Sequence, residues 1–430
     1  MDMLKLYNHQ IEALNLLKDH GSCAIGYGMG LGKTFIASEK MKELNADVNL
    51  VICQKSKIDD WLNHFVENYP EYLVLNLTQK SGLMSFISWS HASLKLVGVI
   101  NYDLVFRKPE LLELQGFTMI LDESSMIQHA NTKRTKFIMK LQSANTILLS
   151  GTFTNGKLEN LWTQAYLTGY DIDQKTFESM YCVKEKRKRF DPQRMRSIFF
   201  NQIVGYKNEE RLFKKLRENG WIFKKTEDAI DLPSETFVQI KVPLSKEYKK
   251  FKKNKVIDLG YLELIGDTPV KRFLYYRMLA GYLSSKKLEA LEDLLNSTNE
   301  RVIIFYNFKS ECNVIENLCE ALNRPVSYMN GSVKDMTAYD DYEDSVTLIQ
   351  YQSGSFGLNL QKCCHTIYFS PPLSTEHYEQ SKARTRRIGQ ERSCFYYQLI
   401  MSDSIENHIY KVLDARRNFN ESLFEDYENE

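Results

Sequence analysis

The sequence lacks the features of several classes of protein. No apolar run approaches the roughly 20 residues that a membrane-spanning helix needs, so no membrane partner is expected. The eight cysteines are scattered and contain no Cys-x-x-Cys pair, which is typical of thiols kept reduced in a cytoplasm. Met1 to His20 has the pattern of a polar amphipathic helix rather than of a signal peptide. We therefore expect a cytoplasmic location.

Clusters of cysteine and histidine, the usual zinc ligands, are also sparse. Cys363, Cys364 and His365 form the one cluster of such residues. Adjacent cysteines rarely bind the same tetrahedral ion, so we expect this cluster to be buried packing. The net charge of +1 excludes a uniformly basic or acidic surface, but local clusters of opposite sign can cancel in that sum.

What the sequence has is enough apolar material for two domains. It is 430 residues long, with 43% hydrophobic and 12% aromatic residues, and shows no composition typical of disorder. Short apolar stretches alternate with helical patterns, which predicts an α/β fold with parallel sheets covered on both faces. The predicted strands are 22–25, 48–53, 73–77, 94–100, 117–121, 145–149, 237–242, 302–306, 326–329, 346–350, 366–369 and 394–400.

A glycine-rich stretch, Gly26 to Thr34, lies between the first predicted strand and a predicted helix. Glycines such as Gly30 and Gly32 permit a loop whose amides face inward and bind phosphate at the helix N-terminus. Lys33 would contact the β- and γ-phosphates of ATP, and the Thr34 hydroxyl would bind Mg²⁺. Tyr27 stands where a strict phosphate-loop pattern has glycine, so a glycine-rich turn without chemistry stays an alternative.

Two carboxylates, Asp122 and Glu123, directly follow the apolar stretch 117–121. They could begin a turn or cap a helix. With a phosphate loop earlier in the chain, Asp122 would instead hold Mg²⁺ and Glu123 would polarise the attacking water. Gln10 precedes the phosphate loop on the first predicted helix; it is either solvent-facing or recognises an adenine edge.

The strand–helix rhythm is lost between 158 and 287, where aromatic residues suggest helices. Two basic runs lie here: Lys184 to Arg196 has seven basic and two acidic residues, and Lys246 to Lys255 has six basic and one acidic residue. Such runs are usually solvated helix faces. Two of them in a chain of near-zero net charge would also suit a polyanionic backbone.

The second half has no phosphate loop of its own. It contains the run Ser353 to Leu360, followed by Arg384 and Arg387, which would share one face of a helix. That helix could simply be exposed and basic. Alternatively, the two arginines could act as arginine fingers on the γ-phosphate of ATP.

Taken in order, these motifs resemble helicase superfamily two, and within it the Swi/Snf-like DNA translocases. The resemblance extends from Gln10 to Gln390, and its most specific match is Arg384 to Gln390, which is close to Arg-x-x-Arg-Ile-Gly-Gln. Four positions depart from the family pattern: Gln54 and Phe153 replace prolines, and Ser124-Ser125 replaces Gly-His or Ala-His. The remaining matching motifs are Met29 to Thr34, Ile52 to Ser56 with Trp61, Asp122-Glu123, and Leu149 to Thr152.

The resemblance implies two RecA-like lobes with parallel sheets and helical insertions between them. Lobe 1 would comprise residues 1–235, with a helical protrusion after about 158. Lobe 2 would comprise residues 236–430, with a second helical insertion to about 287. We expect a minimal motor of the bacterial or phage type, in a bacterial or phage-infected host cytoplasm, without accessory domains.

The resemblance also implies an activity: a DNA-stimulated ATPase that moves on duplex DNA without sequence specificity, with ATP and Mg²⁺ as cofactors. The expected catalytic residues are Lys33, Asp122, Glu123, Arg384 and Arg387. The expected nucleotide-binding residues are Gln10, Gly30, Gly32, Lys33, Thr34 and Gly357, and Thr34 and Asp122 are the expected metal ligands. Strand-end groups are expected to contact the DNA backbone: Lys55, Ser56, Asn101, Tyr102, Asn307, Lys309, Gly331, Ser353 and Ser355.

Three alternatives remain. A strand-separating helicase of the same superfamily would need a wedge that the sequence does not reveal. An RNA-dependent ATPase fits the Arg-Ile-Gly-Gln pattern less well. A nucleotide-gated binding module that never hydrolyses ATP disagrees with the intact Glu123 and Arg387. Replication or recombination proteins are the expected protein partners.

Overall fold

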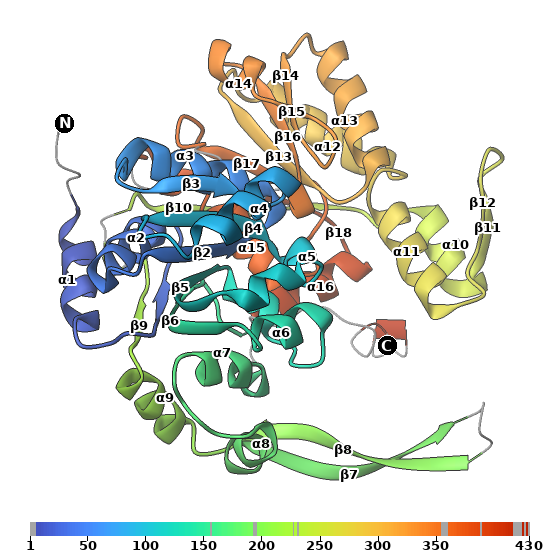
Figure 1. Ribbon diagram of the computed structural model, residues 1–430. Helices are drawn as coiled ribbons and strands as arrows, with labels where there is room; N and C mark the ends of the chain where they lie inside the picture. The colour runs from blue at the N-terminus through green and yellow to red at the C-terminus, as the bar shows by residue number, and fades with distance from the viewer. Residues whose placement is uncertain are drawn as a thin grey trace. The chain divides into compact units, whose positions relative to one another are not determined.

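The structure is a computed structural model that describes residues 6–154, 157–191, 196–226, 228–229, 232–353, 360–387, 389–415, 424 and 427–428 (Figure 1). The chain divides into two compact units, Met1–Ala229 and Ile230–Glu430. Among the described residues, no helix is long and apolar enough to cross a membrane. Each unit is built on its own sheet.

Unit 1 contains a sheet of seven described strands in the order β3-β4-β2-β5-β6-β1-β9, and every neighbouring pair is parallel. Every residue of β2 and β4 is buried, so both faces of the sheet are covered. The strands are β1 (Cys23–Tyr27), β2 (Val48–Cys53), β3 (Leu73–Asn76), β4 (Leu96–Asn101), β5 (Gln115–Asp122), β6 (Gln142–Leu149) and β9 (Trp221–Lys224).

The helices of unit 1 pack their apolar residues into one core with the sheet. In α3, for example, Ile58, Trp61 and Phe65 recur at helical spacing and are buried. The helices are α1 (Asn8–Leu17), α2 (Lys33–Leu44), α3 (Ile58–Asn68), α4 (Lys80–Trp89), α5 (Tyr102–Val105), α6 (Lys133–Ile138), α7 (Trp162–Leu167), α8 (Gln174–Tyr181) and α9 (Glu209–Glu218). Short 3₁₀ turns are η1 (Lys55–Lys57), η2 (Pro109–Glu113), η3 (Ser124–Ile127) and η4 (Leu158–Leu161).

Part of unit 1 differs from the expected helical protrusion. After α8 the chain forms a long antiparallel hairpin of β7 (Cys182–Asp191) and β8 (Arg196–Tyr206). The described part of the first basic run therefore lies on the strands of a hairpin, not on a helix face as expected. The alternation of lysine with other residues along β7 has the two-residue period of a strand. Likewise Trp221, expected among helices, is buried in β9 at the edge of the sheet.

Unit 2 contains a second sheet of seven described strands, in the order β10-β18-β17-β13-β16-β14-β15. All neighbouring pairs are parallel except β14 with β15. Its strands are β10 (Glu235–Val242), β13 (Val302–Tyr306), β14 (Val326–Met329), β15 (Lys334–Asp335), β16 (Val346–Gln350), β17 (His365–Tyr368) and β18 (Cys394–Met401). These two sheets confirm the predicted α/β class with parallel sheets.

The helices of unit 2 begin with side-chain caps at several sites; Ser245, for example, accepts a hydrogen bond from the Tyr248 amide at the start of α10. The helices are α10 (Lys246–Asn254), α11 (Pro269–Ala280), α12 (Ser285–Asn296), α13 (Lys309–Ala321), α14 (Thr337–Asp341), α15 (Thr375–Lys382) and α16 (Ile405–Asp414), with the 3₁₀ turn η5 (Tyr351–Ser353). A small antiparallel pair joins β11 (Val256–Asp258) to β12 (Glu263–Ile265).

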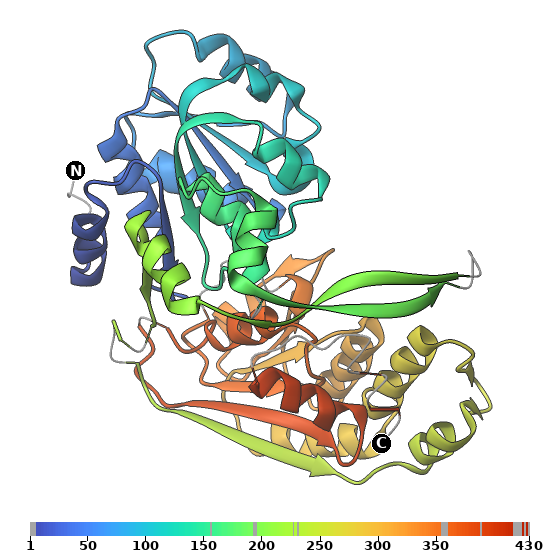
Figure 2. The same cartoon turned by 90° about the horizontal axis from the view of Figure 1, so that it is seen from below.

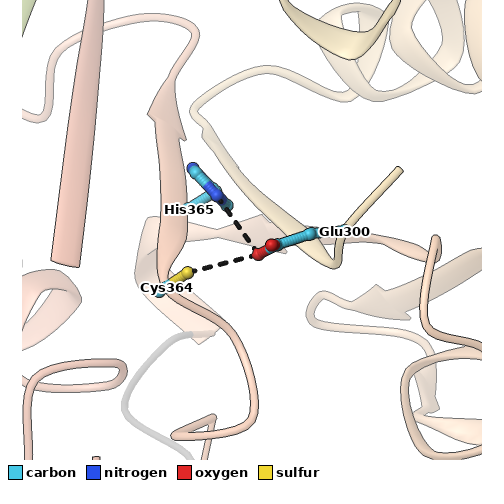
Figure 3. A group of neighbouring side chains, drawn as sticks. All are labelled: Glu300, Cys364 and His365. Atoms are coloured by element: carbon cyan, nitrogen blue, oxygen red, sulfur yellow. Dashed lines mark hydrogen bonds and ion pairs between the residues drawn. The ribbon is translucent and has the colours of Figure 1, made fainter. Parts of the chain in front are cut away.

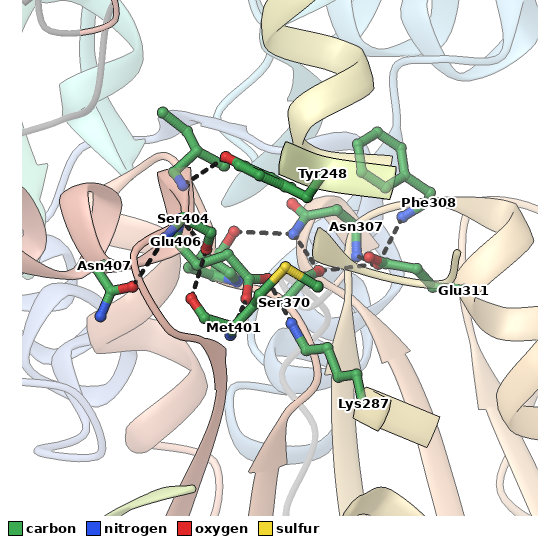
Figure 4. Close-up of polar contacts among 12 residues, drawn as sticks. Tyr248, Lys287, Asn307, Phe308, Glu311, Ser370, Met401, Ser404, Glu406 and Asn407 are labelled. Carbon is green, nitrogen blue, oxygen red and sulfur yellow. Dashed lines mark hydrogen bonds and ion pairs between the residues drawn. The ribbon is translucent and has the colours of Figure 1, made fainter. Parts of the chain in front are cut away.

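A buried polar network lies inside unit 2 (Figure 4). Lys287 and Glu406 form an ion pair, and neither side chain is more than 2% exposed. Burial raises the pKa of Glu406, and the Lys287 charge lowers it. Nearby, Glu311 Oε2 accepts hydrogen bonds from the Asn307 backbone amide at 2.8 Å and from the Ser370 hydroxyl at 2.9 Å. These contacts fix the segments that follow β13 and β17.

Candidate nucleotide and nucleic-acid sites

The sequence motifs of unit 1 gather at one edge of its sheet. Because all seven strands are parallel, their carboxyl ends lie at the same edge. The phosphate loop follows β1, the Asp-Glu pair ends β5, and Ser150 follows β6. Open α/β sheets bind ligands at this edge.

The phosphate loop is held in a shape that requires glycine. Gly30 and Gly32 have φ values of 78° and 67°, in the region that favours glycine. A Cβ on Gly32 would also lie 2.2 Å from Gln10 Nε2, so a side chain there would displace the end of the Gln10 side chain. Helix α2 begins at Lys33, directly after this turn, so its unpaired amides face the loop.

The Lys33 ammonium is hydrogen-bonded to the backbone of the phosphate loop. It donates to the carbonyl oxygens of Tyr27 at 2.9 Å and Gly28 at 3.1 Å. Burial lowers the pKa of Lys33, while the charges of Glu123 and Asp122 raise it. The lysine thus interacts with backbone oxygens of the loop and with the charges of the two carboxylates at the end of β5. An anion entering this loop would restore a charged partner to the buried ammonium.

Gln10 connects helix α1 to the phosphate loop. Its Oε1 accepts from the Tyr7 amide at 2.8 Å. Its Nε2 lies 3.5 Å from the Leu31 carbonyl and 3.4 Å from the Gly32 carbonyl, and the side chain is buried. The adenine contact expected of Gln10 stays a prediction; the structure adds a loop-bracing role that the sequence did not indicate.

Asp122, at the end of β5, is oriented by two aromatic residues. Trp61 Nε1 donates to Asp122 Oδ2 at 2.9 Å, and the Tyr102 hydroxyl donates to the Asp122 carbonyl at 2.9 Å. Trp61 and Tyr102 are both buried. The family-like tryptophan therefore acts directly on the carboxylate expected to hold Mg²⁺.

Glu123 adopts a backbone conformation uncommon for its residue type. Its φ is 52°, in the left-handed region, which costs on the order of 1–3 kcal/mol for a non-glycine residue. The Ser150 hydroxyl lies 3.4 Å from Glu123 Oε2 and 2.7 Å from the Thr152 carbonyl. The strained turn sends Glu123 out of the strand direction, beside the segment that follows β6.

A buried glutamine connects the segments after β5 and β6, and sequence reasoning missed it. Gln164 on α7 accepts from the Ser124 hydroxyl at 2.8 Å, and its Nε2 donates to the Phe153 carbonyl at 2.9 Å. Both Ser124 and Gln164 are 0% exposed. Ser124, which departs from the family pattern, thus has a defined partner.

In unit 2, the structure corrects the expected placement of the two arginines. Helix α15 ends at Lys382, so Arg384 and Arg387 lie in the turns beyond it rather than on one helix face. Gln390 braces this segment: its Nε2 donates to the carbonyls of Gln361 at 3.0 Å and Cys363 at 2.9 Å. Burial lowers the pKa of the Arg387 guanidinium.

The expected nucleic-acid residues of unit 1 differ in exposure. Lys55, in η1 after β2, is exposed, and Ser56 is half-buried. Asn101 and Tyr102 are 3% and 1% exposed, respectively. The Tyr102 side chain is committed to the Asp122 carbonyl, so its expected contact with nucleic acid is not supported.

In unit 2, Lys309 and Gly331 are exposed near the carboxyl ends of β13 and β14. The Asn307 Nδ2 donates to the Ser370 hydroxyl at 2.8 Å and the Pro371 carbonyl at 2.9 Å, so this amide is bonded internally. Ser353 ends η5, and its side chain is outside the described residues. Ser355 and Gly357 lie outside them entirely.

The second basic run has a partly structural role. On α10 and just after it, the Lys252 ammonium lies 4.9 Å from the Tyr427 ring centre. Lys255 Nζ donates to the Tyr276 hydroxyl at 2.8 Å and to Glu428 Oε1 at 3.1 Å. These two lysines hold the C-terminal residues Tyr427 and Glu428 against unit 2. The other lysines of α10, Lys246, Lys249, Lys250 and Lys253, are exposed.

The cysteine–histidine cluster meets a carboxylate at the start of β17 (Figure 3). Glu300 Oε2 lies 3.3 Å from His365 Nε2 and 3.5 Å from Cys364 Sγ. The guanidinium of Arg392 also forms an ion pair with Glu300 at 2.5 Å. Burial raises the pKa of Cys364 to about 11, so the thiol is neutral. The positive charge of Arg392 already pairs with the Glu300 carboxylate, and the Cys364 thiol carries no charge. The three side chains are therefore better suited to a hydrogen-bonded cluster than to a cation site.

Comparison with known proteins identifies the family. Residues 6–292 match the SNF2-related domain, and residues 286–389 match the helicase conserved C-terminal domain. YwqA of Bacillus subtilis (strain 168), provisionally named an ATP-dependent helicase/translocase, is 25% identical over 94% of this chain and 46% of that protein. YqhH of the same organism, named as an uncharacterized ATP-dependent helicase, is 22% identical over 94% of this chain and 77% of that protein.

Among solved structures, the Sulfolobus solfataricus SWI2/SNF2 ATPase core in complex with dsDNA is similar with a TM-score of 0.45 and 20% identity. The similarity covers 98% of this chain and 92% of that one. The chain spans less than half the length of YwqA. The first family match alone covers well over half of the chain and includes every unit 1 motif described above. The chain therefore belongs to the SNF2-related ATPase family of helicase superfamily two.

Proposed function

We propose that the protein is a DNA-stimulated ATPase that couples ATP hydrolysis to translocation on double-stranded DNA. The observation that carries the proposal is the placement of Lys33, Asp122 and Glu123 at one edge of the unit 1 sheet. A phosphate loop together with a pair of carboxylates is what phosphoryl transfer to water needs: a cradle for the phosphates and a group that orients the water.

Lys33, Asp122 and Glu123 of unit 1 each have a role in ATP hydrolysis. The amides at the start of α2 and the Lys33 ammonium bind and orient the β- and γ-phosphates. The Glu123 carboxylate accepts a hydrogen bond from the attacking water and so orients it. Trp61 and Tyr102 fix the Asp122 side chain and backbone, so these groups are preorganised before ATP binds.

Mg²⁺ fits the donor atoms present. The Thr34 hydroxyl and the Asp122 carboxylate offer oxygen ligands, which Mg²⁺ prefers, and Asp122 is already oriented by Trp61. We propose that these two residues hold the ion, directly or through water. When bound, the ion would neutralise charge that develops on the phosphate oxygens.

Arg384 and Arg387 are proposed from the family resemblance as the arginines that stabilise charge on the γ-phosphate. A guanidinium is always protonated and presents several donors in a plane, which suits a phosphoryl group. Their segment is braced by Gln390, so its backbone is fixed within unit 2. The Tyr102 side chain is buried and donates to the Asp122 carbonyl, so we do not propose it as a DNA contact.

Duplex DNA is the proposed track, read through its backbone. Exposed lysines such as Lys55 and Lys309 can contact phosphates, and phosphate contacts carry no sequence information. The relatives named as helicases also allow strand separation, and RNA is the less favoured substrate. Protein partners in replication or recombination, and a cytoplasmic location, stay predictions.

The proposal is tested by ATPase rates measured without nucleic acid and with duplex DNA, single-stranded DNA or RNA. Duplex DNA should stimulate turnover most. Equal rates in all four conditions would contradict a nucleic-acid-driven motor. Stimulation by RNA alone would favour the RNA-dependent alternative, and ATP binding with no turnover in any condition would favour a nucleotide-gated binding module.

A further inference from the structure

The hairpin β7–β8 is a long ribbon that the fold of unit 1 does not bury. Its strands are 10 and 11 residues long, and Figures 1 and 2 show it extending away from α8 and the rest of unit 1. Residues 183–188 of β7 are all exposed, on both faces of the ribbon. A two-stranded ribbon without a covered face is marginally stable by itself, so its length calls for a role other than packing.

The two faces of the ribbon differ in charge. Lys184 pairs across the strands with Ile203, Lys186 with Asn201, and Lys188 with Phe199, so these six side chains share one face. No acidic residue stands among these three cross-strand pairs. We call this side of the ribbon, which carries Lys184, Lys186 and Lys188, the lysine face.

The opposite face carries mixed charge. There Glu185 pairs with Gln202 and Arg187 pairs with Phe200. The Arg187 and Glu185 side chains form an ion pair at 3.6 Å. These two charges of the opposite face therefore neutralise each other. On the lysine face only Lys184 has an acidic neighbour, Glu178 at 2.6 Å, among the residues that the structure describes.

We propose that the hairpin is a duplex-binding arm and that its lysine face lies against the phosphates bordering the major groove of DNA. Alternate residues of a strand are about 6.6 Å apart, so the three lysines span about 13 Å. The major groove is about 12 Å wide and admits a two-stranded ribbon. A row of positive charge of this length matches the phosphates on either side of the groove.

This inference rests on the proposed function for its ligand, duplex DNA, and goes beyond it in naming the arm and the face. The alternative occupant of such a ribbon is a single strand, bound by base stacking on an exposed aromatic side chain. Phe199, on the lysine face, is 70% exposed and is the residue that would stack. The lysines favour the duplex because three charges are spaced regularly, whereas the three cross-strand pairs described above include one exposed aromatic residue, Phe199.

The test compares two triple variants that lose the same charge. In one, Lys184→Gln, Lys186→Gln and Lys188→Gln neutralise the lysine face. In the matched control, Arg211→Gln, Lys214→Gln and Arg217→Gln remove three exposed positive charges from α9 of the same unit. The dissociation constant for a labelled duplex is measured by fluorescence anisotropy over a series of salt concentrations, with circular dichroism as the check of folding.

The lysine-face variant should bind all duplex sequences more weakly. The slope of log affinity against log salt should fall by about 2–3, because each phosphate contact contributes about 0.9. The slope of the control variant should stay at the wild-type value. Phe199→Ala should leave duplex affinity within about twofold of wild type, because no stacking is involved.

Four results would overturn the proposal. The first is a folded lysine-face variant whose salt slope equals that of a wild type that binds duplex DNA. This result would contradict the proposed role of the hairpin but not the proposed function. Equal loss in the control variant would mean that only net charge matters. A large loss of single-strand affinity in Phe199→Ala, with duplex affinity kept, would make the hairpin a strand-contacting element. A wild type that binds no duplex DNA would contradict both the arm and the proposed function.

Discussion

Gln164 should position the catalytic carboxylates although it touches neither of them. Its side chain accepts from Ser124, the residue after Glu123, and donates to Phe153 in the segment that follows Ser150. We propose three variants: Ser124→Ala, Gln164→Leu and the two together. Each single change breaks the link between the two segments and leaves a buried polar group without a partner, which costs about 1–3 kcal/mol of stability.

The expected effect on catalysis follows from the backbone of Glu123. Its positive φ is strained, and Ser124, anchored to Gln164, is the next residue in the chain. Without this anchor the turn can relax, and a displacement of about 1 Å can cost ~10²-fold in rate. We expect kcat to fall about 10- to 100-fold, or about 1.4–2.7 kcal/mol, with the KM for ATP little changed.

The two residues should act as a unit. The double variant should therefore be no slower than the slower single variant, with a coupling energy of about 1.4–2.7 kcal/mol, as large as a single effect. Thr163→Val is the matched control: Thr163 neighbours Gln164 on α7, and its hydroxyl donates at 2.8 Å to the carbonyl of Ile127, the last residue of η3, and not to Ser124. The kcat and KM for ATP and the thermal midpoint are measured for all four variants and the wild type. Multiplicative losses in the double variant, or an equal kcat loss in Thr163→Val, would refute the positioning role.

Four further predictions concern single groups. Lys33→Ala should abolish ATP turnover with its circular dichroism spectrum kept; near-normal turnover would exclude the phosphate-loop assignment. Glu123→Gln should bind ATP in a filter assay but hydrolyse it very slowly, because an amide orients water poorly; parallel loss of binding and turnover would instead make Glu123 structural. Arg387→Ala, and similarly Arg384→Ala, should lower kcat by roughly 10³ with ATP affinity nearly kept, whereas loss of DNA affinity alone would place the pair on a nucleic-acid surface. Lys287→Met should lower the free energy of unfolding by about 3–5 kcal/mol because it leaves the buried Glu406 carboxylate without its charged partner. Combining it with Glu406→Gln should recover part of this loss. A thermal melt in which neither change matters would contradict a buried ion pair.

Strands with continuous apolar runs were predictable from the sequence. The stretch 48–53 is the whole of β2, because six successive buried residues with turn signals around them fit a central parallel strand. The phosphate loop and the Asp-Glu pair were also visible, since their chemistry needs particular residues at fixed spacing.

Other features depend on tertiary contacts and were missed. The Ser124–Gln164 hydrogen bond joins residues 40 positions apart, and neither residue forms a local motif with the other. The lysines of the hairpin by themselves predict a solvated helix face, whereas their two-residue period along β7 is that of a strand. Arg384 and Arg387 were placed on a helix by their spacing alone, whereas α15 ends before them at Lys382. Trp221 joined a sheet whose other strands lie far from it in the sequence.

The measurement that tests the central claim most directly is displacement of a triplex-forming strand from duplex DNA, run beside unwinding of a forked duplex. A translocase on double-stranded DNA should displace the third strand in an ATP-dependent manner and leave the underlying duplex closed, and Lys33→Ala should do neither. Robust unwinding of the fork, with no triplex displacement, would contradict duplex translocation and establish a strand-separating helicase instead.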